Sequence, residues 1–261
     1  MLNLTTLESA ARLGFAARGL MYMAIGYLTL RSGQTGGNTD ALSFIGGAGG
    51  EIILAIMALG FVAYGLWRLS EAVFDSEGNG SDGMGVAKRV GGAVSGLVHL
   101  ALAWASVRLI TGTGGGNGEV AERGASTALG FPGGAVALMV VAVVLLGVGA
   151  YQLVKAVKLG FLKHLDPRVA REQWIAWLGR AGYLARGTVF ILVALFTWRA
   201  GQQSQSAEAG GTEQALDALP EWLRIVVAAG FVMFGVFSLV EARYRRINDP
   251  GVLARLRRRA S

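Results

Sequence analysis

Long apolar runs separated by short polar segments dominate this chain. Crossing a bilayer requires about 20 mainly apolar residues. Six runs meet this requirement: 13–30, 52–73, 90–109, 134–157, 181–198 and 222–242. The segments between them are rich in glycine, serine and acidic residues, and none is long enough for a separate soluble domain. The pattern therefore predicts an all-α integral membrane protein with six transmembrane helices.

The opening of the first run recurs twice along the chain, which indicates an internal repeat. Each copy begins with Arg-x-Gly, carries a second glycine five residues after the first, and ends in an arginine. The first and last arginines of the three copies are Arg12 and Arg31, Arg89 and Arg108, and Arg180 and Arg199. They are separated by about 28 Å of helix. We expect these six side chains to reach the headgroup layers on opposite sides of the membrane.

The second helix of each unit repeats as well, in "GLWRLSEA" (65–72), "GAYQLVKA" (149–156) and "GVFSLVEA" (235–242). A helical hairpin leaves and re-enters on the same side, so the three copies are expected to be parallel. The predicted architecture is three hairpins about a pseudo-threefold axis along the membrane normal. The expected units are an N-terminal segment 1–12, hairpins 13–75, 88–160 and 178–245, and a basic tail 246–261.

This pattern resembles a bacterial membrane family catalogued as domain of unknown function 1206. The resemblance rests on the openings "GFAARG" (14–19) and "GYLARG" (182–187), and on the Glu-Ala or Lys-Ala that ends each second-helix motif. It implies triplicated pairs of transmembrane helices and brings no activity with it. The middle copy departs from the pattern, with Ser95 where the other copies have arginine.

Basic residues are concentrated on one side of the predicted membrane protein. Of 24 lysines and arginines, all but five lie on the side of the termini, which has a net charge of +10 against −3 on the other. Such a bias places both termini in the cytoplasm, here at the bacterial cytoplasmic membrane. Nucleic-acid binding would need a folded basic domain with interleaved aromatics, and this sequence has none, so nucleic acid is not expected as a partner. We therefore expect membrane lipids, with anionic headgroups on the cytoplasmic face, or a membrane protein as partners.

Charged side chains recur inside the apolar spans, where an unpaired charge is expensive. They change together between copies: Arg18 with Glu71, Ser95 with Lys155, and Arg186 with Glu241. Because the second helix of a hairpin returns to the depth of the first, we expect Arg18 to pair with Glu71, and Arg186 with Glu241. Lys155 is expected to reach Glu71 or Glu241 of a neighbouring hairpin. The alternative is that these charges form an ion or proton site.

His99 lies midway along the third run, where the sister copies have Tyr22 and Phe190. A buried imidazole can bind haem or a pigment, or relay protons. It can also hydrogen-bond between helices, as Ser95 can. The other histidine, His164, lies in a loop, so a pair of histidine ligands inside the membrane is not available. We therefore expect neither a cofactor nor a metal.

Two Asp-Pro segments, 165–177 and 248–259, have helix-start signals followed by basic, amphipathic sequence. We expect both to lie on the cytoplasmic face against anionic lipid. The tail is alternatively a docking site for an acidic partner.

The chain has no cysteine, and its spans hold neither paired carboxylates nor a histidine–acid cluster. The favoured function is therefore a non-enzymatic structural or accessory membrane protein that binds lipid or another membrane protein. The alternative is a transporter or channel for a small solute, and a membrane enzyme comes third.

Overall fold

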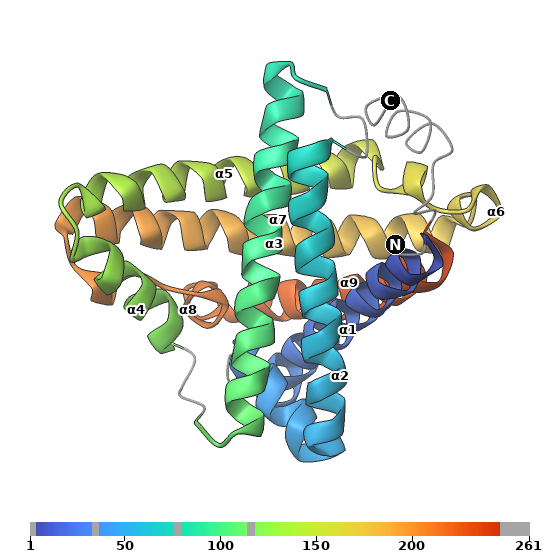
Figure 1. The fold of residues 1–261 in the computed structure, drawn as a ribbon, viewed down its shortest axis with the longest axis horizontal. Helices are drawn as coiled ribbons and strands as arrows, with labels where there is room; N and C mark the ends of the chain where they lie inside the picture. The colour runs from blue at the N-terminus through green and yellow to red at the C-terminus, as the bar shows by residue number, and fades with distance from the viewer. Residues whose placement is uncertain (1–3, 33–36, 76–79, 114–117, 246–261) are drawn as a thin grey trace.

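The computed structural model describes residues 4–32, 37–75, 80–113 and 118–245. Six of its helices are long and apolar enough to cross a membrane (Figure 1). They are α1 (Leu4–Ser32), α2 (Asn38–Phe74), α3 (Gly83–Ile110), α5 (Gly134–Lys158), α7 (Gln173–Gln203) and α9 (Glu221–Tyr244). The all-α, six-span membrane fold predicted from the apolar runs is confirmed.

Shorter helices occupy the connections between the spans. They are α4 (Gly118–Leu129), η1 (Leu162–His164), α6 (Pro167–Ala170), η2 (Ser206–Glu208) and α8 (Thr212–Asp217). α4 was not expected, because its segment lies between two predicted spans and is rich in glycine, serine and acidic residues. α2 also begins well before the predicted span, and it turns at Gly50, whose φ of 74° is a conformation that favours glycine.

The helix expected over 165–177 is only partly correct. The carboxylate of Asp166 accepts a hydrogen bond from the backbone N–H of Arg168 at 2.9 Å, so the Asp-Pro start is present. However, α6 is a single turn, and the chain then enters α7, whose first turns carry the exposed Trp174 and Trp177. The second such segment, 248–259, lies outside the described residues.

The most extensive helix packing joins helices of different repeats and not the two helices of one repeat. α1 packs on α9, α3 on α2 and α7 on α5. The hairpins α1/α2 and α7/α9 are also packed, whereas α3 and α5 of the second hairpin do not form a packed pair among the described residues. In Figure 1 the α2/α3 pair runs steeply across the α5/α7 pair. The pseudo-threefold axis therefore stays a prediction, although the helix partners follow a cyclic order.

Each of these three crossings is made by two glycines that the repeats share. The pairs are Gly19 with Gly235, Gly96 with Gly65, and Gly187 with Gly149. A Cβ atom added to the first glycine of each pair would lie 2.9, 2.9 and 3.1 Å from the carbonyl oxygen of the second. Small residues let helix backbones approach closely in lipid, so the repeated glycines set these crossings.

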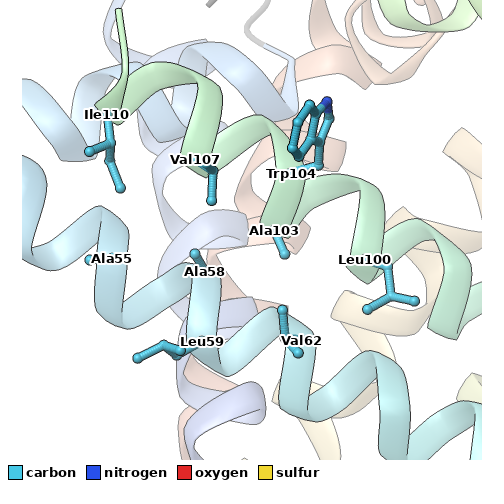
Figure 2. A pocket seen from close by; sticks show the side chains of 9 residues that line it. All are labelled: Ala55, Ala58, Leu59, Val62, Leu100, Ala103, Trp104, Val107 and Ile110. Carbon is cyan, nitrogen blue, oxygen red and sulfur yellow. The ribbon is translucent and has the colours of Figure 1, made fainter.

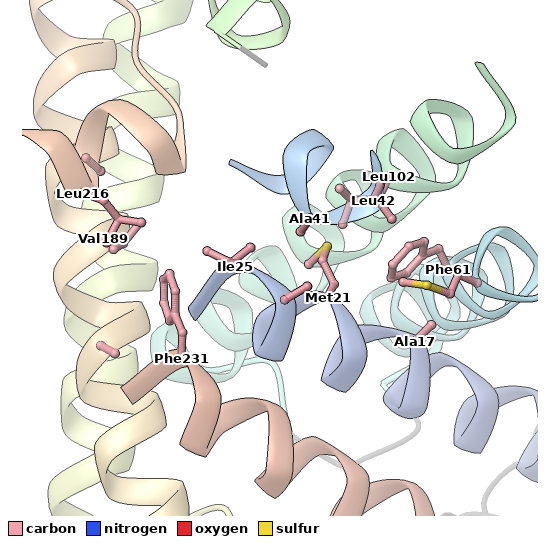
Figure 3. Close-up of a cluster of buried hydrophobic side chains, with 14 of the residues drawn as sticks. Ala17, Met21, Ile25, Ala41, Leu42, Phe61, Leu102, Val189, Leu216 and Phe231 are labelled. Carbon is pink, nitrogen blue, oxygen red and sulfur yellow. The ribbon is translucent and has the colours of Figure 1, made fainter. Parts of the chain in front are cut away.

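A buried apolar cluster fills the space where α1, α2, α3, α7, α8 and α9 meet (Figure 3). Met21, Ile25, Phe61, Leu216 and Phe231 are among its most buried members. None of its buried residues comes from α5. α5 is the least buried of the six spans, with 22% of its apolar window covered by protein.

Candidate functional site

The buried charges of the protein gather beside the glycine crossings. We call α1/α9 the first junction, α3/α2 the second and α7/α5 the third. We call the basic end of a span the end nearest Ala11, Phe74, Lys88, Lys158, Gln173 or Tyr244. In each junction, the repeat positions of Arg18 and Glu241 lie between the two glycines and the basic ends of the helices. The three junctions can therefore be compared position by position.

The first junction holds a complete ion pair. The side chain of Arg18, only 4% exposed, donates from Nη2 to Oε2 of Glu241 at 2.5 Å. It also donates from Nε to the hydroxyl of Ser238 at 3.2 Å and from Nη1 to the hydroxyl of Tyr64 at 2.9 Å. Glu241 accepts a second bond from Nη1 of Arg245 at 2.6 Å. Arg18 therefore ties α1 to both α2 and α9.

The expected pairing within each hairpin is wrong. Arg18 pairs with Glu241 of the third repeat, because α9 crosses α1 at the glycines and brings its carboxylate to the depth of Arg18. Glu71 accepts instead from Arg68, one turn earlier on α2. The expected pair of Arg186 with Glu241 does not form either, since Glu241 is held by two other arginines.

The second junction supplies its cation from the opposite helix. Ser95 stands on α3 at the place that Arg18 has on α1, and Arg68 stands on α2 at the place that Ser238 has on α9. Nη1 of Arg68 donates to Oε2 of Glu71, which is 3% exposed. The arginine is therefore on the second helix of the motif and not on the first, and the buried carboxylate of Glu71 still has a cationic partner.

His99 lies beside this second junction and is buried. Its Nδ1 is 2.7 Å from the backbone carbonyl oxygen of Ser95. Because a carbonyl only accepts, Nδ1 carries the hydrogen, and Nε2 of the neutral ring keeps its lone pair. Nε2 has no hydrogen-bond partner among the described residues. The ring lies 4.4 Å from that of Tyr64 and 6.0 Å from that of Phe61. Nε2 is thus the one atom of this residue that is able to bind a ligand.

The third junction has no carboxylate. Neither α5 nor α7 contains an aspartate or glutamate. The guanidinium of Arg186 lies over the rings of Tyr22, Phe190 and Phe234, at 5.1, 5.5 and 4.6 Å from their centres.

Lys155 was expected to reach Glu71 or Glu241. Its amine lies 4.8 Å from the ring centre of Tyr151 and 5.5 Å from that of Tyr183. Lys155 thus contributes a second cation to the third junction. That it reaches Glu71 or Glu241 stays a prediction.

Two of the six arginines expected at the headgroups cap helix ends. Arg12 donates to the carbonyl oxygen of Ala242 at 2.8 Å and to that of Arg243. Arg89 donates to the carbonyl oxygens of Ala72 and Val73, at 2.7 and 3.1 Å. Ala242 and Ala72 occupy the same motif position, so each capping arginine binds the last turn of the helix that it crosses, where cations are favoured.

The other four lie differently. Arg108 donates to the carbonyl oxygen of Thr113, Arg31 lies over the ring of Tyr27, and Arg180 lies over that of Trp177. Arg199 is exposed. That they reach the headgroup layers stays a prediction.

An apolar groove of about 510 Å³ runs between α2 and α3. Figure 2 shows side chains of both helices along it. It is lined only by apolar residues: Ala55, Ala58, Leu59, Val62, Leu100, Ala103, Trp104, Val107 and Ile110. This groove was not predicted from the sequence.

Sequence reasoning also missed Arg68, Tyr64, Ser238 and Arg245. A signal for two of them was present, because Arg68 and Ser238 share one position of the second-helix motif, three residues before the acid.

These features define a class: a six-span α-helical membrane protein built from three related helix pairs that interlock through glycine crossings and buried arginines. The chain belongs to the family described as Domain of Unknown Function (DUF1206), which it matches over residues 13–75, 90–158 and 181–245. It is similar to "Uncharacterized protein YxxB" of Bacillus subtilis (strain 168), with 24% identity over 249 residues and 90% of each chain covered. No solved structure matches the chain.

Proposed function

We propose that this protein is a non-enzymatic accessory protein of the bacterial cytoplasmic membrane that binds lipid. The observation that carries the proposal is the groove between α2 and α3, which is lined by nine apolar residues and no polar one. Its lining lies in the halves of both spans away from their basic ends.

The occupant that fits this groove is an acyl chain of a bilayer lipid. Both walls belong to membrane spans, so hydrocarbon chains are what surrounds them. The small side chains of Ala55, Ala58 and Ala103 leave room between the helices, and Trp104, which is 66% exposed, adds an aromatic wall. Dispersion contacts with such a wall favour a bound chain over a freely moving one.

The buried charges support a structural role. Glu71 and Glu241 each accept a hydrogen bond from an arginine. Arg18 donates hydrogen bonds to three side chains of neighbouring helices. Groups bound in this way hold helices together. This supports an accessory protein over an enzyme.

The lipid proposal is tested by photo-crosslinking. The purified protein is reconstituted with a phospholipid that carries a diazirine on its acyl chain, and the crosslinked peptides are mapped. Crosslinks should concentrate on residues 55–62 and 100–110, and Ala55→Phe should deplete them by filling the groove. Val143→Phe, at an exposed position of α5, is the matched control. Crosslinks spread evenly over all six spans would contradict the proposal.

The orientation, with both termini in the cytoplasm, is tested by single cysteines in this cysteine-free chain. A membrane-impermeant thiol reagent on intact cells should label a cysteine at Ser206 and spare one at Ser81. Asn117, which lies outside the described residues, is expected to behave like Ser206. The reverse pattern would contradict the assignment.

Small-solute transport is the second candidate, and the observation that favours it is the unpaired Nε2 of the buried His99. A conduit needs polar groups that replace the hydration of a solute across the whole membrane. Liposomes with the protein should therefore pass no ion or small polar solute above background. Transport that His99→Phe abolishes would establish the second candidate instead.

A further inference from the structure

The groove between α2 and α3 is about one leaflet deep. Its lining on α3 extends from Leu100 to Ile110, which is about 15 Å of helix and half of the roughly 30 Å hydrocarbon core of a bilayer. Toward the basic ends the lining stops at the crossing of Gly65 and Gly96. A Cβ atom at Gly65 would lie 2.9 Å from the carbonyl oxygen of Gly96 and 2.9 Å from Cγ of Leu100, so the two helices are in close contact there. The groove is therefore closed toward the middle of the membrane.

The other end of the groove, which we call its mouth, is flanked by two opposite charges. Ala55 and Ile110 line this end (Figure 2). Glu51 lies one turn before Ala55 on α2, and Arg108 lies one turn after Trp104 on α3. Positions four apart share a face of a helix. The two stripes that line the groove thus continue into a carboxylate on one helix and a guanidinium on the other.

Both charges lie at the same depth in the membrane. Glu51 is 14 residues from Gly65 along α2, and Arg108 is 12 residues from Gly96 along α3. At 1.5 Å per residue, they lie about 18–21 Å from the point where the two glycines cross. Each glycine lies three residues on the basic-end side of the middle of its span. The charges are therefore about 14–17 Å from the middle, where the hydrocarbon core meets the headgroups.

The guanidinium of Arg108 is oriented by the backbone and keeps donors to spare. Its Nε and Nη2 donate to the carbonyl oxygen of Thr113, at 3.1 and 2.5 Å. Nη1 and the second hydrogen of Nη2 are left, and this edge of a guanidinium suits two oxygens of one phosphate. Among the described residues, Arg108 forms no ion pair, and the exposed Glu51 forms neither an ion pair nor a hydrogen bond. The two charges at the mouth are thus not paired with each other.

We infer that the groove selects a phospholipid whose headgroup has both a phosphate and a primary amine, which is phosphatidylethanolamine, from the leaflet opposite the basic ends. The inference rests on the proposed function, in which an acyl chain lies in the groove. The phosphate of the headgroup binds Arg108, and its ammonium group donates to Glu51. Phosphatidylglycerol has no cation for Glu51, and the quaternary amine of phosphatidylcholine has no N–H to donate. The pair of unlike charges therefore matches one headgroup of the three.

The test is photo-crosslinking with the full chain in a bilayer. Three phospholipids carry the same diazirine on the acyl chain and differ only in the headgroup, which is ethanolamine, choline or glycerol. Each is a trace component of the same phosphatidylcholine bilayer. We expect crosslinks on residues 55–62 and 100–110 to be about three- to five-fold more abundant with ethanolamine than with either other headgroup, which is the effect of an exposed ion pair.

Charge variants locate the headgroup contacts. Glu51→Gln should remove the preference for phosphatidylethanolamine. Glu51→Lys, which leaves two cations at the mouth, should turn the preference toward phosphatidylglycerol. Arg108→Gln should lower crosslinking in the groove by phosphatidylethanolamine about three-fold or more, because the phosphate loses its charged donor. Glu122→Gln, on the exposed face of α4, and Arg199→Gln, at the repeat position of Arg108, are the matched controls and should behave as the parent does.

The outcomes separate this inference from the proposed function. Crosslinks in the groove that are equally abundant with the three headgroups, or a preference that Glu51→Lys leaves unchanged, would overturn the headgroup assignment and leave the lipid groove standing. Crosslinks spread evenly over all six spans with every probe would overturn the groove as a lipid site, and the headgroup assignment with it.

Discussion

At the first junction Arg18 is bonded to Glu241, whereas at the third Arg186 lies over aromatic rings and neither helix contains an acid. The two junctions nevertheless have the same glycine crossing, with backbones at nearly the same separation. The comparison shows that close backbone contact, not the ion pair, brings these helices together. The pairing of the buried charges differs from junction to junction although the glycine crossing is the same.

The largest expected effect comes from removing the acid of the first junction. Glu241→Gln leaves Arg18 and Arg245 without their shared carboxylate, and an uncompensated buried charge costs about 3–5 kcal/mol. The free energy of unfolding is measured by titration with sodium dodecyl sulfate in mixed micelles, followed by circular dichroism. Glu221→Gln, at the exposed start of α9, is the control. A loss no larger than that of the control would show that the pair is dispensable.

The next largest effect tests the glycine crossing itself. In Gly235→Ala the added Cβ lies 2.6 Å from the carbonyl oxygen of Gly19, so the two helices must separate. Overpacking of this kind costs about 1–3 kcal/mol. Gly149→Ala at the third junction should cost a similar amount. Gly147→Ala, whose Cβ meets nothing within 4 Å, should cost little. If Gly235→Ala lowered the free energy of unfolding and Gly149→Ala did not, the glycine crossing would not have the same role in the two junctions.

A smaller effect, of opposite sign, is expected when the third junction receives the acid of the first. Lys155→Glu places a carboxylate at the repeat position that Glu241 has in the first junction. If Arg186 bonds to it, a hydrogen bond to a charged group contributes about 1.5–3 kcal/mol. After the cost of burying the acid, we expect a gain of about 1 kcal/mol in the same unfolding assay. Lys158→Glu, on the exposed last turn of α5, should show no gain in stability.

The smallest expected effect on stability comes from Glu213, which lies in α8 and belongs to neither junction. Partial burial, and then repulsion from Asp40 and Asp217, raises the pKa of Glu213 above its usual 4.5. A raised pKa favours the protonated form in the folded state, so the contribution of Glu213 to stability is present at acidic pH and lost as pH rises through the pKa. Glu213→Gln should therefore gain stability relative to the parent between pH 4 and neutrality. A difference that does not vary with pH would contradict this assignment.

The six spans and the repeats were predictable because apolar length and motif spacing are local properties of the sequence. The spacing of the charges along each motif is a local property too. Which of these charges pair was not predictable, because all three repeats present their charges at one depth. Depth alone does not distinguish a partner in the same hairpin from one in the next.

The groove escaped prediction for a related reason. Ala58 and Ala103 lie 45 residues apart in sequence, and each is an ordinary small residue of an apolar span. Only the crossing of α2 and α3 near Gly65 and Gly96 makes them neighbours. α4 was missed because its glycines and polar residues are typical of a loop, although its helix is amphipathic.

The cyclic order of the helices has a consequence for how the chain is made. Arg18 is synthesised 223 residues before Glu241. At roughly 5–20 residues per second, that interval lasts about ten to forty-five seconds. During it Arg18 can bond to Tyr64 of α2 but lacks its carboxylate, and only the last span completes the ion pair. The first helix is therefore the last to complete its contacts, and a chain that stops before α9 leaves Arg18 without an ion pair.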